Sequence, residues 1–207
     1  MSQTVTEPKK QTSRKVRALL AGGLVLGVGA AVTLATWTDQ EWATGIFGAG
    51  SFNIQSSNDG ATFADNESQD GAAALDFELT GGDNLNLAPG ATVAAPFVLQ
   101  LDADTTYDAN VSLEEATATP VDADLTYGIV TVDDVAACTA EATGTAVVPA
   151  GTAIGTTEGA TVFDLTAGAE GATGAPVTLC FQVTAGDGLV EGQEITASWG
   201  FLGESVE

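Results

Sequence analysis

The 207-residue chain contains no histidine, and its five basic residues all lie within the first 17 positions. Without histidine, a Ser-His-Asp triad, a Cys-His pair or a histidine-containing zinc site cannot be built. Chemistry based on a lysine amine is excluded after Arg17. Paired carboxylates remain, but acids are so abundant that the proximity of two of them has almost no specificity. We therefore expect no catalytic residue and no enzyme activity.

The scarcity of positive charge also limits the partners of the chain. Residues 36–207 contain 27 of the 28 acidic residues and no basic one. Phosphate binding depends on Lys and Arg, so nucleic acid is excluded as a partner of this part. The like charges favour solubility and repel one another. Most of the acids are interpreted as a solvated face, and bridging by calcium is the alternative.

Long hydrophobic runs are scarce as well, and the most membrane-like stretch, residues 18–35, contains no charge. A basic start, an apolar middle and a small-residue exit are typical of a secretory signal peptide. We predict a signal peptide over 1–35, cleavage between Ala35 and Thr36, and a mature domain over 36–207. The alternative is an uncleaved anchor, because 18 apolar residues approach the roughly 20 that span a bilayer. Contact with a membrane, and with a signal peptidase, is thus expected only during export.

Cysteine is used twice, as Cys138 and Cys180. An even number of cysteines in a secreted chain predicts one disulfide between them. Two buried free thiols are the alternative.

Helical periodicity of useful length is absent after residue 40, and period-two alternation takes its place. Alternation of apolar and polar residues with β-branched and aromatic side chains is typical of half-buried strands. Pro96 suggests that its strand lies at an edge or carries a bulge. The predicted strands are 51–55, 75–80, 91–102, 109–116, 125–134, 176–185 and 194–203.

The stretch 142–175 is nearly low-complexity and is predicted to hold two weak strands between long loops. Seven to nine short strands separated by Gly-, Asn- and Asp-rich turns predict an all-β fold. We expect an antiparallel, jelly-roll-like β-sandwich that follows the N-terminal signal segment.

Residues 36–48 join the signal segment to this domain and carry Trp37, Trp42, Ile46 and Phe47. This arm is interpreted either as the first strand of the domain itself or as an extended segment. An extended arm can pair with the open sheet edge of a neighbouring copy.

Calcium is the one possible cofactor that the sequence leaves open, because it prefers clustered oxygen ligands. The weak candidate ligands are Asp102, Asp104 and Asp108. Their loop lacks the glycine and the terminal glutamate of an EF-hand. A second acidic cluster comprises Asp59, Asp65, Asn66, Glu67 and Asp70.

Two stretches resemble a known family of secreted proteins. Past the predicted cleavage site stand Trp37, Asp39, Thr44-Gly45, Phe47, Ala49-Gly50 and Phe52-Asn53-Ile54. Downstream, a Leu-x-Pro-Gly turn and the strand after it contain Leu87, Pro89, Gly90, Phe97 and Leu99. Together they resemble the proteins with SipW-dependent-type signal peptides, the TasA and camelysin group.

This resemblance implies export through a dedicated signal peptidase, a jelly-roll-like sandwich and a role at the cell surface or in an extracellular matrix. Some members of this group are subunits of fibres or of a biofilm matrix, so the resemblance implies the same possible role for this chain. Camelysin-like proteins are sometimes described as metalloproteases, but this chain contains no zinc-binding motif.

The sequence therefore predicts a secreted, non-enzymatic structural protein, extracellular or at the surface of a Gram-positive-type bacterium. Its expected partner is a second copy of itself or a matrix polymer. The alternative is a soluble module that binds calcium or carbohydrate through acidic loops at one end of the sandwich.

Overall fold

The computed structural model describes residues 13–20, 50–77, 87–169 and 171–206. The chain divides into two compact units, Met1–Phe47 and Gly48–Glu207. In the first unit, residues 13–20 form a helix. Within the described ranges, no helix has both the length and the apolar character needed to cross a bilayer. The predicted cleavage site at Ala35 and Thr36 and the arm 36–48 lie outside the described residues.

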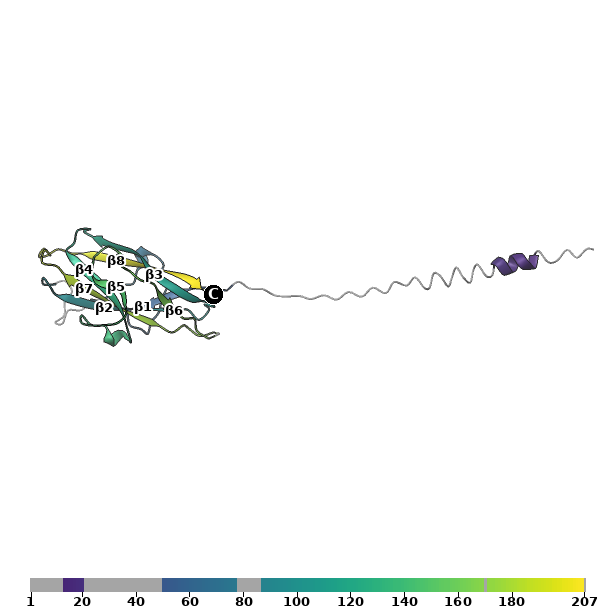
Figure 1. Cartoon of the computed structure of the whole chain (residues 1–207), viewed down its shortest axis with the longest axis horizontal. Helices are drawn as coiled ribbons and strands as arrows, with labels where there is room; N and C mark the ends of the chain where they lie inside the picture. Colours follow the sequence, from purple (N-terminus) through teal and green to yellow (C-terminus); the bar gives the residue numbers. More distant parts are fainter. Residues whose placement is uncertain (1–12, 21–49, 78–86, 170, 207) are drawn as a thin grey trace, which may run out of the picture. The chain divides into compact units, whose positions relative to one another are not determined.

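The described part of the second unit consists of β-strands and two short 3₁₀ helices (Figure 1). The helices are Gln69–Gly71 (η1) and Val135–Ala137 (η2). The strands are Ile54–Ser57 (β1), Thr92–Leu101 (β2), Asp108–Thr119 (β3), Leu125–Val132 (β4), Ala146–Ala153 (β5), Phe163–Leu165 (β6), Val177–Ala185 (β7) and Thr196–Val206 (β8).

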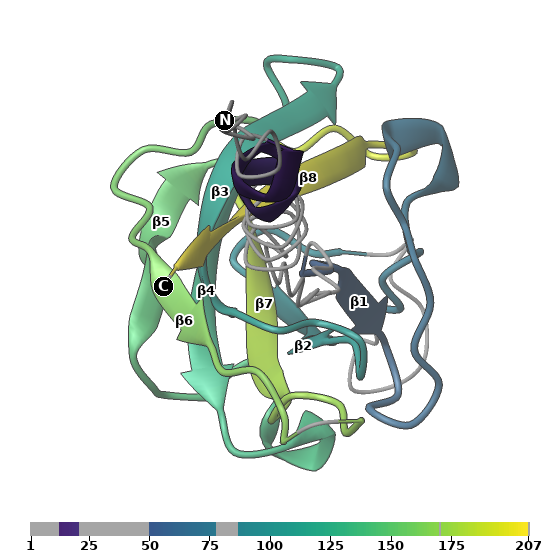
Figure 2. The same ribbon diagram turned by 90° about the vertical axis from the view of Figure 1, so that its right-hand side faces the viewer.

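The strands form two antiparallel sheets that pack against each other. The larger sheet has the order β1-β2-β7-β4-β5 and the smaller one the order β6-β3-β8. Every strand pair is antiparallel. The view along the sandwich in Figure 2 shows the layers end on. The predicted all-β antiparallel sandwich is confirmed.

The pairing follows a jelly roll with one exception. A jelly roll is a long antiparallel hairpin that has rolled up, so its strands pair from the outside of the hairpin inward. The pairs β2–β7, β3–β6 and β4–β5 are all present. The outermost pair, β1–β8, is missing, because β1 pairs with β2 instead. The smaller sheet therefore ends at β8, where the jelly-roll pattern would place one more strand.

Most predicted strands are confirmed, and the disagreements are local. The stretch 142–175 contains β5 and β6, the two weak strands that were expected. The predicted strand 75–80 is wrong for 75–77, which belong to no sheet, and 78–80 lie outside the described residues. Pro96 lies in the part of β2 that pairs with β7 alone, since β1 reaches only as far as Val98.

The turn before β2 has the geometry that its Pro-Gly pair suggests. Ala91 N donates to Ala88 O at 2.9 Å, and Gly90 has a φ of 77°. A positive φ at the third turn residue, after a proline, defines a type II turn and favours glycine there.

The core lies between the sheets and consists of the inward side chains of the long strands. Residue alternation places one face of each strand in this layer. The largest fully buried side chains include Tyr127, Phe181, Leu101, Ile129 and Leu165. Burying each of these side chains contributes about 1.5–3 kcal/mol relative to leaving it exposed. This burial holds the two sheets together, since no ion pair joins them.

Candidate functional site

The three calcium candidates lie in and beside the loop between β2 and β3. The carboxylates of two of them accept hydrogen bonds from backbone N–H groups. Asp102 Oδ1 accepts from Ala103 N at 2.6 Å. Asp108 Oδ1 accepts from Ala167 N at 2.7 Å, which fixes the loop after β6. Asp104 is exposed and contributes its backbone carbonyl to Ser51 Oγ. Among the described residues, no group of three or more acids converges as metal ligands would. The calcium site stays a prediction.

In the second acidic cluster, Asp59 caps a turn that follows β1. Its Oδ1 accepts from Thr62 N, Ala61 N and Ser57 Oγ, each at 2.8 Å. These hydrogen bonds hold the pKa of Asp59 well below its ordinary value, and the two from the backbone have the largest effect. Hydrogen bonds to the charged form favour it, so this carboxylate has a structural role.

Replacing Asp59 with alanine is expected to lower the melting temperature at pH 7. Because the folded-state pKa is depressed, the stabilisation is complete above the ordinary aspartate pKa of about 3.9. It decreases as the pH falls below that value and is gone once the pH passes the folded-state pKa. Thermal unfolding of both proteins from pH 7 to pH 3 should therefore show a narrowing difference. Asp122→Ala, which removes an exposed acid of the same charge, is the matched control; an equal effect in the control would contradict this role.

The predicted disulfide between Cys138 and Cys180 is present, with the two Cα atoms 5.1 Å apart. It fastens the end of η2 to the middle of β7, where Cys180 is fully buried. Gln182 Nε2 supports the same loop by donating to Thr139 O and Ala142 O, both at 3.0 Å. The loop over this part of the larger sheet is therefore held by both covalent and polar contacts.

A large cavity in the described part of the second unit lies where the β1–β8 pair is missing. Its volume is about 1290 Å³. We call it the β8 groove. Its floor is the larger sheet, one wall is β8, and the opposite wall is β1 with the segment after it. The main side chains of the floor and of the β8 wall are Val93, Phe97, Leu99, Phe181, Val183, Trp199 and Phe201.

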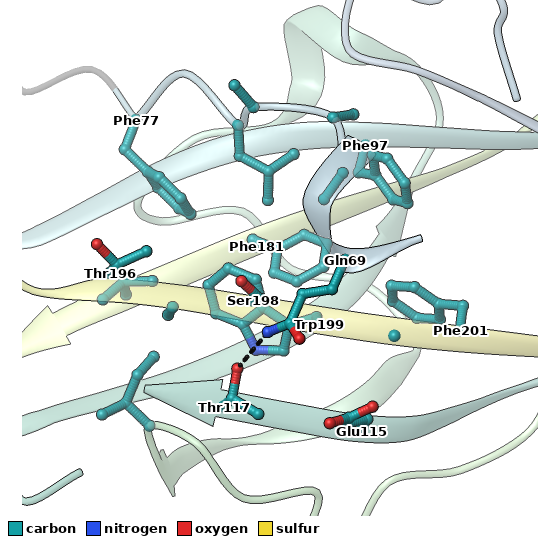
Figure 3. A pocket seen from close by; sticks show the side chains of 18 of the residues that line it. Gln69, Phe77, Phe97, Glu115, Thr117, Phe181, Thr196, Ser198, Trp199 and Phe201 are labelled. Atoms are coloured by element: carbon teal, nitrogen blue, oxygen red, sulfur yellow. Dashed lines mark hydrogen bonds between the residues drawn. The ribbon is translucent and has the colours of Figure 1, made fainter. Parts of the chain in front are cut away.

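Several aromatic side chains gather in the β8 groove, as Figure 3 shows. The ring centroids of Trp199 and Phe181 are 4.9 Å apart, and those of Phe201 and Phe97 are 5.9 Å apart. Trp199 and Phe201 point to the core side of β8 but are only half-buried. They stay partly uncovered because the smaller sheet ends at their own strand.

The β8 groove is closed at one end and reaches the surface elsewhere. A Cβ at Gly203 would overlap the side chain of Ile54, so β1 and β8 are in contact at that point. The lining also includes the exposed residues Glu67 and Glu194. An extended segment entering between β1 and β8 would thus lie along β8 and end near Gly203.

The free edge of β8 has no partner within the described part of the chain. Its other edge pairs with β3 from Thr196 to Val206. No backbone hydrogen bond joins the free edge to a described residue outside the sheet. Unpaired N–H and C=O groups in a row form a template for another strand.

The other edge strands are protected, whereas β8 is not. The edge strands are β1, β5, β6 and β8. β1 has four residues and β6 three, and β5 contains Pro149 and two register shifts. β8 has 11 residues, and Thr196–Gly203 contain neither a charge nor a proline. Short length, proline and irregularity are the usual protections of an edge, so β8 is the edge suited to pairing.

Two buried side-chain polar atoms of the described part lack a hydrogen-bond partner, one in the lining of the groove and one behind its wall. One is Trp199 Nε1 in the β8 wall. The other is Asn58 Oδ1, whose Nδ2 donates to Ala74 O in the opposite wall.

The sequence predicted a strand at 194–203 but did not identify the β8 groove. Residue alternation in a strand places Trp199 and Phe201 on the same face of it. Whether β8 is central or at an edge depends on pairing between distant strands, which the residues of β8 do not encode. No family model matches the sequence, and no curated protein matches it.

Proposed function

We propose that this chain is a secreted, non-enzymatic structural protein of the cell surface or extracellular matrix. Copies join when the arm, residues 36–48, of one copy adds as a strand to β8 of the next. The observation that carries this proposal is the long edge of β8, which is uncharged over Thr196–Gly203, has no partner among the described residues and lies beside an aromatic groove. Strand addition gives affinity through main-chain hydrogen bonds and specificity through side-chain pockets.

The dimensions of the arm and the groove support this occupant. An extended arm of 13 residues spans about 43 Å at a rise of about 3.3 Å per residue. The 11 residues of β8 need about 36 Å at the same rise. The groove volume of about 1290 Å³ also exceeds the roughly 300–1,000 Å³ of a small-molecule site. A peptide segment suits it better than a small ligand.

The charge of the chain supports the same mode of contact. Because residues 36–207 contain no basic side chain, copies of this part cannot be held together by ion pairs between side chains. Main-chain hydrogen bonds and burial of aromatic rings need no opposite charge. Glu67, Glu115 and Glu194 line the groove, so the approach of a second acidic copy is favoured when salt screens the repulsion.

Three features support export. The basic residues precede an uncharged stretch that ends at small residues, as in a signal peptide. The disulfide Cys138–Cys180 is of a kind that persists in oxidising compartments. The resemblance of residues 37–54 to the TasA and camelysin group points to the same route and to a matrix role.

Analysis of the protein recovered from culture medium tests the proposal. N-terminal sequencing should find Thr36 as the first residue. Sedimentation velocity should show higher-order species whose share grows with protein concentration and with added salt or calcium. A protein that stays strictly monomeric at every concentration and salt level would overturn the assembly proposal. That result is expected if the arm of each copy pairs with β8 of the same copy.

A further inference from the structure

The segment 72–77 in the wall opposite β8 has the pattern of a strand but the bonding of a loop. Ala73, Leu75 and Phe77 are half-buried, while the residues between them are exposed. Period-two burial is typical of a strand with one face on a core. Yet no backbone hydrogen bond joins 73–77 to either sheet within the described ranges. An extended, unpaired segment therefore lies opposite an unpaired strand edge.

Side chains, rather than a ladder of backbone bonds, hold this segment in place. Leu75 and Phe77 pack against the core cluster, and the Phe77 and Trp199 ring centroids are 6.4 Å apart. Asn58 Nδ2 donates to Ala74 O. In Figure 3, Phe77 points from the segment toward Trp199 on β8. In Figure 2 the part of the chain that follows β1, in blue, lies on the side of the sandwich occupied by β1.

Leu75 and Phe77 occupy the space that an incoming strand would need. Both side chains line the β8 groove together with Trp199 and Phe201. A strand paired with β8 sends every second side chain into this groove, where Phe77 already contacts Trp199. The incoming strand also forms the backbone bonds that 73–77 do not form, so it can replace the segment.

We propose that residues 72–77 form an internal strap that covers the β8 groove in the single copy and is displaced when a strand pairs with β8. This inference rests on the proposed function and adds its regulation. The strap shields the aromatic wall and lowers the affinity of the groove for the arm. Assembly then requires a raised local concentration of copies, and a single copy keeps its core covered.

The strap is tested with the full-length Trp42→Ala, Ile46→Ala protein, whose own arm is expected to leave the groove free, and a synthetic peptide of the parent residues 36–48, using two readouts by NMR. Amide exchange at 196–203 reports strand pairing with β8. The nuclear Overhauser effect between the Phe77 and Trp199 rings reports the strap in its place. At saturating peptide, exchange at alternate amides of 196–203 should slow about tenfold or more, and the Phe77–Trp199 effect should disappear.

The two readouts separate the two ideas. Slowed exchange with the Phe77–Trp199 effect retained would overturn the strap and leave strand pairing intact. Unchanged exchange at saturating peptide would overturn the pairing itself, and the strap with it. The nuclear Overhauser effect between Phe77 and Trp199 would persist in this way if 72–77 were a fixed part of the groove wall.

A substitution in the strap gives an independent test by peptide titration. Leu75→Ser weakens the strap without changing β8, so the peptide should bind about tenfold more tightly. Val162→Ser is the matched control, because Val162 is 59% exposed and is not among the groove residues. Equal or weaker binding by Leu75→Ser, with the control unchanged, would overturn the strap.

Discussion

Replacing Trp42 and Ile46 with alanine is expected to abolish self-association while leaving the sandwich folded. In an extended arm, even-numbered positions share one face. That face carries Trp42 and Ile46 and no charge, whereas Asp39 and Glu41 lie on the other face. The uncharged face is the one suited to the aromatic β8 groove. Losing two buried apolar side chains at about 1.5–3 kcal/mol each weakens association a hundredfold or more.

Sedimentation velocity at equal protein concentration and salt measures this effect. The matched control replaces Thr38 and Gln40 with alanine, on the same face of the same arm, and should assemble like the parent chain. Circular dichroism of all three proteins should be the same, since none of these positions belongs to β1–β8. Full assembly by the Trp42→Ala, Ile46→Ala protein would contradict the proposed use of this face.

Removing the disulfide is expected to have the largest effect on folding stability. Cys138 and Cys180 are separated by 42 positions, and releasing a loop of that length costs about 4 kcal/mol in the chain-entropy model. The domain has no ion pairs among its own side chains to offset this loss. For a domain of this size, the melting temperature should fall by roughly 10 °C.

Thermal unfolding of the Cys138→Ala, Cys180→Ala protein measures this loss. The parent chain in excess reductant should unfold at the same temperature as the variant, which checks that the lost bond is the cause. The Gln182 bonds to Thr139 O and Ala142 O should keep the loop near β7 in the folded variant. A change in melting temperature of one or two degrees would show that the loop is already constrained in the unfolded chain.

The long strands could be predicted closely because local alternation determines them. The predicted stretches 91–102, 125–134 and 176–185 correspond to β2, β4 and β7 within two residues at each end. All three contribute alternating or continuous apolar residues to one core, so burial and β propensity agree. The disulfide followed from the even number of cysteines in a chain that is expected to be secreted.

The site could not be predicted, because it depends on which strands become neighbours. The stretch 75–80 has the alternation of a strand, yet 75–77 lie unpaired across the groove. Among the described strands, β1 pairs with β2 and leaves one edge of β8 open. The alternation of residues along a strand determines which side chains face the core. The pairing of strands distant in the sequence determines which of those side chains are covered by a neighbouring strand.

The most direct test of strand addition between copies uses an assembled mixture of two labelled forms of the chain. One form carries ¹⁵N and the other ¹³C, so solid-state NMR contacts between the two labels arise only between copies. Strand addition between copies predicts contacts between amide nitrogens of 196–203 in one form and carbonyl carbons of 36–48 in the other. Assemblies without such contacts, or with contacts to another edge strand such as β5, would contradict it.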